Sequence, residues 1–168
     1  MENTTISNSE TTKPVQYAGF WWRFLAYLID DIVLSFVFGI IFVPVFAIMG
    51  VSFWALFEGN VEPESEEILA GSIALLSFFL GSVALIIQWL YFAIMESSKT
   101  QGTLGKMALR IKVTGYDGQR ISFGQATGRY FGKIVSGLIL YIGFIMAGFT
   151  AKKQALHDMM ASCLVIKE

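Results

Sequence analysis

The sequence predicts an all-α membrane protein with two transmembrane helices, a third short apolar segment and a small cytoplasmic β-hairpin. Three observations carry this prediction. The 26 residues from Ile32 to Phe57 include no charged side chain, a second apolar stretch runs from Ile68 to Met95, and 55% of the chain is hydrophobic. A helix rises about 1.5 Å per residue, so the first run alone can cross the ~30 Å hydrocarbon core of a bilayer.

The first half of the chain divides by composition. Residues 1–16 are polar and have too little apolar surface to fold, so we expect a disordered cytoplasmic tail before a membrane domain at 17–168. Helix one is expected at 19–57 and helix two at 68–95. The loop 58–67 between them holds five acidic residues and no Lys or Arg, which predicts that it faces outward.

A basic segment follows helix two. Residues 96–133 hold seven Lys or Arg against two acids, so this part is expected in the cytoplasm, as is the amino terminus. Apolar and polar residues alternate over 108–114, and a GYDG turn separates them from 119–123, which predicts a hairpin within the basic segment 96–123. Cys163–Ile166 could add a further strand.

The third apolar segment, at 124–150, is ambiguous. Its apolar part, Ile134–Phe149, has 16 residues, and two lysines follow almost at once. If it spans the bilayer, those lysines lie outside, against the positive-inside rule; if it turns near Leu140–Gly143, both flanks and the tail 151–168 stay in the cytoplasm. The charge rule favours the re-entrant or interfacial arrangement, and a full span stays open.

Several classes of site are not expected. The chain has one cysteine, Cys163, and one histidine, His157, too few for a disulfide, a metal cluster or a Ser–His–Asp site, so we expect no cofactor, no metal and no enzyme. The GTLGK sequence at Gly102–Lys106 lacks the spacing of a phosphate-binding loop. The basic segment is expected to contact anionic lipid headgroups and not nucleic acid.

Three segments of the chain carry a family resemblance. GFWWRFLAYLIDDIVL at Gly19–Leu34 resembles the opening signature of the RDD family of small bacterial membrane proteins, in which Arg23 and Asp30 match the arginine and the first aspartate. The segment 100–130 looks like the family's second block. Its matching residues are Thr103, Gly105, Lys106, Val113 and Arg129.

The closing segment KKQALHDMMASCLVI resembles the family's R-Q-x-x-H-D ending. Gln154, His157 and Asp158 match it, Lys153 stands where arginine is usual, and Asp158 would be the second family aspartate. The resemblance implies a multi-pass protein of the bacterial cytoplasmic (inner) membrane. It also implies a function related to small-solute or cation/proton transport, which has been proposed for some members.

The candidate site is a cluster of charges. Arg23, Tyr27 and Asp30 lie at i, i+4 and i+7 and so share one helix face, which predicts an Arg–Asp pair. We predict that Asp158 also approaches the Arg23 guanidinium, because its planar fork can bind two carboxylates. The pair either lines a polar cavity or locks helix one to its neighbours at the cytoplasmic boundary.

The remaining candidates support that cluster. His157 either relays protons with Asp30 or acts as a helix cap or ion pair. Gln88, deep in helix two, is expected to form a helix–helix hydrogen bond. Lys106 and Gln154 complete the set of supporting residues.

Two functions are compatible with this pattern. In a transport component, Arg23, Asp30 and Asp158 would line a cavity. Since one chain with two firm spans is too small to enclose a path, a homo-oligomer or another membrane protein would be needed. In a non-transporting scaffold or accessory protein, the same charges would tie the tail and the hairpin to helix one.

Overall fold

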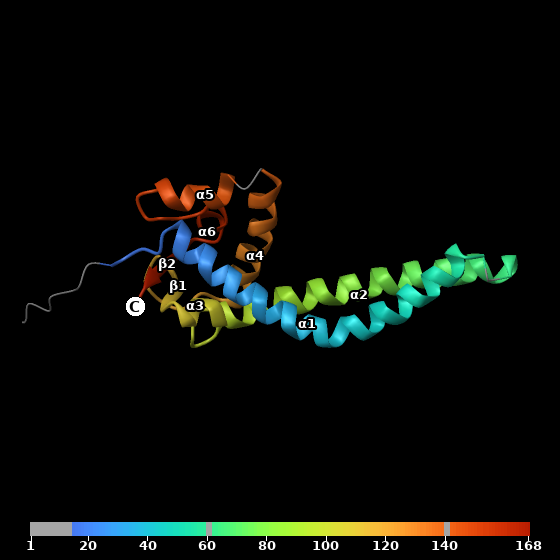
Figure 1. Ribbon diagram of the computed structural model, residues 1–168. Coiled ribbons are helices and arrows are strands. Elements are labelled where there is room, and N and C mark those ends of the chain that lie inside the picture. The colour runs from blue at the N-terminus through green and yellow to red at the C-terminus, as the bar shows by residue number, and fades with distance from the viewer. Residues whose placement is uncertain (1–14, 60–61, 140–141) are drawn as a thin grey trace, which may run out of the picture.

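Two long helices form a hairpin that projects from a smaller domain (Figure 1). The computed structural model describes residues 15–59, 62–139 and 142–168. Helix α1 spans Phe20–Phe57 and helix α2 spans Pro63–Ser97, and each is long and apolar enough to cross a membrane. The fold class predicted from the sequence is therefore confirmed.

The hairpin differs from the prediction at its tip. Helix α2 begins at Pro63 and not at Ile68, so the predicted outer loop 58–67 is shorter than expected. Proline suits the first turn of a helix, and negative charge there is favourable beside the unpaired backbone N–H groups, so the acidic stretch joins the helix.

The smaller domain lies at the opposite end of the hairpin (Figure 1), and its described residues form four helices and two strands. In chain order these elements are α3 (Leu104–Ala108), β1 (Ile111–Gly115), α4 (Phe123–Leu138), α5 (Ile142–Phe149), α6 (Leu156–Met160) and β2 (Cys163–Lys167).

The small sheet is present, but its second strand comes from the tail. β1 pairs antiparallel with β2, with Ile111 opposite Lys167 and Gly115 opposite Cys163. The segment 119–123, predicted as the second strand of a β-hairpin, forms only an isolated bridge between Arg120 and Thr114. The tail strand pairs with β1 because it buries three consecutive side chains, Cys163 to Val165, in the core. The segment 119–123 buries only Ile121 and leaves its other residues exposed.

The segment before α1 also joins this sheet. The Ala18 amide donates to the Val165 carbonyl at 2.8 Å, and the Lys167 amide donates to the Gln16 carbonyl at 2.8 Å. Of the tail predicted to be disordered, 1–16, residues 1–14 lie outside the described residues. Both ends of the membrane domain are thus fastened to one small sheet.

Two helices replace the single third apolar segment. The axes of α4 and α5 differ by 103°, and the pair counts as a third span only if it is one bent span. The Ser122 side chain accepts from the Gln125 amide and the Gln125 side chain from the Ser122 amide, which sets the start of α4. Of the turning point predicted at Leu140–Gly143, residues 140–141 lie outside the described residues and Gly143 lies in α5.

The apolar core lies where the base of the hairpin meets the sheet. Its members come from α1, α2, β1, β2 and α4, and include Ala26, Ala93, Val113, Ala126 and Val165. The outer part of the hairpin is different, because large side chains such as Phe36 and Phe78 stand more than two-thirds exposed. Such surfaces are stable in lipid and not in water.

Candidate functional site: a buried charge network

Asp158 in α6 joins three parts of the chain. Its carboxylate accepts from the Arg23 guanidinium, from Arg129 Nε at 2.8 Å and from the Ala155 amide at 3.0 Å. The side chain is completely buried. The predicted contact between Arg23 and Asp158 is confirmed, and it closes α1 and α4 onto the tail.

Glu96 at the end of α2 forms the second centre of the network. Its carboxylate contacts the Lys106 ammonium and accepts from an Arg129 terminal nitrogen at 2.8 Å, while Lys133 Nζ lies 3.6 Å away. Glu96 follows the apolar stretch directly and is not among the residues predicted for the site. The signal that could have found it is an acid placed directly between an apolar helix and a basic segment.

Arg129 connects the two centres, because its guanidinium binds both Asp158 and Glu96. We call the five residues Arg23, Glu96, Lys106, Arg129 and Asp158 the charge network. Two arginines balance two carboxylates, and Lys106 adds a further cation. In the described part of the chain, every buried side-chain nitrogen and oxygen has a hydrogen-bond partner. Buried charges are tolerated only when they are paired in this way.

Asp30 lies outside this network, so the predicted pair with Arg23 is wrong. Its carboxylate accepts from the Gly105 amide at 2.7 Å, from the Tyr91 hydroxyl at 2.8 Å and from the Thr103 hydroxyl. Seven helical residues separate Arg23 from Asp30 by about 10.5 Å of rise, so a shared face does not bring them into contact.

Arg23 instead directs its other donors away from Asp30. Its Nε donates to the Ala18 carbonyl at 2.8 Å, and a terminal nitrogen donates to the Lys153 carbonyl at 2.5 Å. The arginine therefore holds the start of α1 against the chain that follows α5.

The segments that carry the family resemblance meet in space around these two sites. Thr103 and Gly105, from the second segment, bind Asp30 from the first, and Arg129 binds Asp158 from the third. The motif residues of the second segment thus act mainly as partners for the acids. Lys106 binds Glu96, which belongs to none of the three segments.

The charges in the small domain have altered proton affinities. Burial alone would raise the pKa of Asp158, but Arg129 and Arg23 outweigh it and hold that pKa well below its usual range. For Lys106, burial lowers the pKa to about 7, because Glu96 offsets the loss of hydration only in part. The carboxylate of Asp158 therefore stays ionised at neutral pH.

His157 is packed and neutral at pH 7. Its ring lies 5.0 Å from the Phe144 ring, and its Nδ1 lies 3.4 Å from the Ser136 hydroxyl. Burial lowers the His157 pKa to about 3. No contact with Asp30 is present in the described residues, so the geometry does not support a relay between these two groups. The capping role falls to its neighbour Asp158, whose carboxylate accepts from the amide of Ala155, the residue directly before α6.

This histidine predicts a specific pH dependence of stability. The unfolded chain takes up a proton on His157 near pH 6.5, whereas the folded protein does not until about pH 3. Because the unfolded state binds more protons in that window, the free energy of unfolding should fall as the pH falls from 6.5 toward 3. The carboxylate of Asp158 adds to this only below its ordinary pKa of 3.8.

Thermal unfolding in detergent, recorded between about pH 4.5 and pH 7, separates the two contributions. A His157→Gln variant should show a flatter dependence than the unchanged protein, whatever its absolute stability. Equal slopes in the two proteins would contradict a buried neutral histidine.

The residues predicted to support the charge cluster lie in different places in the structure. Gln88 accepts from the Tyr130 hydroxyl at 3.4 Å, so it does join α2 to α4, although by a long bond. Gln154 donates to the Cys163 carbonyl at 2.9 Å and to the Tyr116 hydroxyl at 3.0 Å, which fixes the tail beside the sheet. Tyr27 is half-exposed on α1 and is not part of the charge network.

The arrangement shows no metal centre. Among residues 15–59, 62–139 and 142–168, no three His, Cys, Asp or Glu side chains are placed to hold a metal ion together. Two pockets on the described surface, one lined by α1 and α2 and one by α5, include no member of the charge network among their lining residues.

Comparison with known proteins agrees with this geometry. The RDD family model matches residues 17–162. Uncharacterized protein YxaI of Bacillus subtilis (strain 168) is 42% identical over 153 residues, which cover 89% of this chain and 96% of that protein. Uncharacterized membrane protein YteJ of the same organism is 30% identical over 159 residues, covering 90% and 82%. No solved structure matches the chain. Since the family match covers most of the sequence and two long apolar helices lie within it, this chain is a membrane protein of the RDD family.

Proposed function

We propose that this protein is a scaffold or accessory protein of the bacterial cytoplasmic (inner) membrane, and that its charge network is structural. The observation that carries the proposal is that both carboxylates of the network form ion pairs with cations of the same network. Asp158 forms ion pairs with Arg129 and Arg23, and Glu96 forms ion pairs with Arg129 and Lys106. A carboxylate that must release and rebind a cation or proton needs access to water, whereas these two are buried and ion-paired.

Transport is the alternative function. It would require the charged residues to face a cavity shared between helices or between subunits. Asp30 would be the most suitable carboxylate, because no cation among the described residues forms an ion pair with it. It accepts three hydrogen bonds instead and is 1% exposed, which again favours a structural role.

The geometry also supports a multi-pass topology with the termini in the cytoplasm. The Lys153 carbonyl after α5 binds Arg23 near the start of α1, and α4 begins beside the end of α2. Both flanks of the α4–α5 pair therefore lie at the base of the hairpin (Figure 1). A re-entrant or interfacial pair gives this result, whereas a full span would place the flanks on opposite sides.

Helix α4 has the pattern of a lipid-facing element. It buries small and polar residues, including Arg129, Gly132 and Ser136, and it exposes large apolar ones, including Phe131 and Leu138. A helix in water shows the reverse pattern. We therefore place the base of the hairpin within the membrane boundary, where the exposed Lys99, Arg110 and Arg120 can contact anionic headgroups.

The scaffold proposal predicts no ion flux. Proteoliposomes containing a pH-sensitive dye should respond to an imposed sodium or potassium gradient no faster than empty liposomes, because no charged group of the network is open to exchange. An added ionophore shows that the vesicles are sealed. Flux in the unchanged protein that Asp30→Asn abolishes, with thermal unfolding preserved, would establish transport and remove the proposal.

The topology predicts opposite labelling at two positions. In a Cys163→Ser background, a cysteine at Gly59 should react with an impermeant reagent from outside, and a cysteine at Lys153 only after the membrane is opened. The background is suitable because Cys163 is completely buried and burial raises the pKa of its thiol to about 11. Outside labelling at position 153 would show that α4 and α5 together cross the bilayer.

A further inference from the structure

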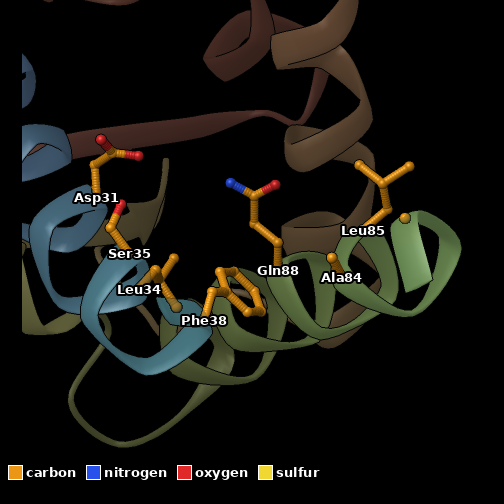
Figure 2. Close-up of a pocket in the computed structure, with 8 residues that line it drawn as sticks. Asp31, Leu34, Ser35, Phe38, Ala84, Leu85 and Gln88 are labelled. Atoms are coloured by element: carbon orange, nitrogen blue, oxygen red, sulfur yellow. The ribbon is translucent and has the colours of Figure 1, made fainter. Parts of the chain in front are cut away.

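A groove between α1 and α2 holds polar groups that the charge network does not use. It has a volume of about 370 Å³, and Figure 2 shows Asp31 and Ser35 on α1 directed toward the same space as Gln88 on α2. Asp31 is exposed and, in the described part of the chain, has no hydrogen-bond or ion-pair partner. An unpaired carboxylate at a membrane boundary is costly and needs a ligand or water.

The other two polar groups are also available. Five serines in the described part of the hairpin, at positions 52, 72, 77, 82 and 97, donate back to carbonyls of their own helix, but Ser35 makes no such bond among the described residues. Gln88 uses its oxygen to accept from Tyr130, which leaves its amide nitrogen as a donor that faces α1 (Figure 2). The groove thus offers one anionic acceptor and two neutral donors.

These groups are ordered along the axis of the hairpin. Asp31 and Gln88 lie at the end of the groove nearest the small domain, whereas Phe38 and Gly81, further along α1 and α2, line the end toward the tip of the hairpin. Twenty-six residues separate Asp31 from Phe57, or about 39 Å of helix, close to the ~40–45 Å thickness of a bilayer with its headgroups. If the tip reaches one surface, Asp31 lies in the headgroup layer of the other.

We infer that this groove binds an aminophospholipid, with the headgroup ammonium on Asp31, the phosphate oxygens on Ser35 and Gln88, and the acyl chain along the apolar end. The ammonium supplies the cation that Asp31 lacks, and its N–H groups donate to the carboxylate, which a quaternary amine cannot do. The phosphate accepts from the two neutral donors. The site is independent of the scaffold proposal, because none of its three polar residues belongs to the charge network.

Native mass spectrometry of the full chain in detergent, with phosphatidylethanolamine, phosphatidylcholine and phosphatidylglycerol of the same acyl chains, tests this inference. The unchanged protein should prefer phosphatidylethanolamine by about tenfold, as one charge-assisted hydrogen bond predicts. Asp31→Asn should remove the preference, and Gln88→Leu should weaken it. Glu67→Gln, which removes an exposed acid near the hairpin tip, should leave the preference unchanged.

Asp31 is exposed and outside the core, so its variant should unfold at the same temperature as the unchanged protein. Equal binding of the three lipids, or a preference that persists in Asp31→Asn, would overturn the inference. A dimer that forms only when Asp31 is present would show that a second copy occupies the groove. Displacement of the lipid by sodium chloride with retention of sodium would show that it is a simple cation site.

Discussion

Replacing Arg129 with glutamine should destabilise this protein more than the loss of any other single charge. Arg129 is 2% exposed and binds both Asp158 and Glu96, which are 0% and 1% exposed. Without it, Glu96 would retain Lys106 and Asp158 would retain Arg23, but each carboxylate would lose a buried ion pair. Breaking a buried pair costs about 3–5 kcal/mol, and here one substitution breaks two.

Such a loss is comparable with the whole stability of a typical domain, about 5–15 kcal/mol. We therefore expect little monodisperse Arg129→Gln protein after detergent extraction, and a large fall in the unfolding temperature of what remains. The matched control is Arg120→Gln, because Arg120 is exposed and forms no ion pair in the described part of the chain. If the two variants unfold at the same temperature, the charge network is not structural.

Replacing Gly105 with alanine should have the second large effect, through packing and not through charge. A Cβ atom at this position would lie 2.0 Å from the Ala26 carbonyl oxygen and 3.0 Å from the Asp30 carboxyl carbon. The obstacle is the backbone of α1, which cannot rotate away. Overpacking of a core typically costs about 1–3 kcal/mol, and a backbone obstacle places this variant at the upper end or beyond.

The same change would displace α3 from α1 and break the bond between the Gly105 amide and Asp30. Fluorescence-detected size exclusion and thermal unfolding should both show the loss. Gly128→Ala is the control, because nothing lies within 4 Å of the added methyl group and alanine favours a helix by about 0.5–1 kcal/mol. Similar behaviour of the two variants would show that α3 does not pack this closely on α1.

The sequence by itself determined the architecture of the hairpin. A run of apolar residues long enough to cross a bilayer has few alternatives to the helical conformation, because every backbone N–H and C=O group in lipid needs a hydrogen-bond partner within the protein. The bounds of α1 follow the predicted 19–57 within one residue, and the contact between Arg23 and Asp158 follows from motif residues that match the family. The hairpin depends on composition and on local periodicity, which the linear sequence contains directly, whereas the contact between Arg23 and Asp158 depends on the family resemblance.

The tertiary structure decided which groups become partners. Asp30 shares a helix face with Arg23, yet it binds the α3 backbone and Tyr91. β1 pairs with a strand some fifty residues away and not with its neighbour in sequence. Glu96 belongs to no motif, and Arg129 matches the family's second block without indicating a partner; the packing of α2, α4 and α6 brings them together. The physical reason is that an ion pair or a strand pair forms only when groups on separate elements come within a few ångströms of each other. Hydropathy and helix periodicity describe one element at a time, so they contain no information about those distances.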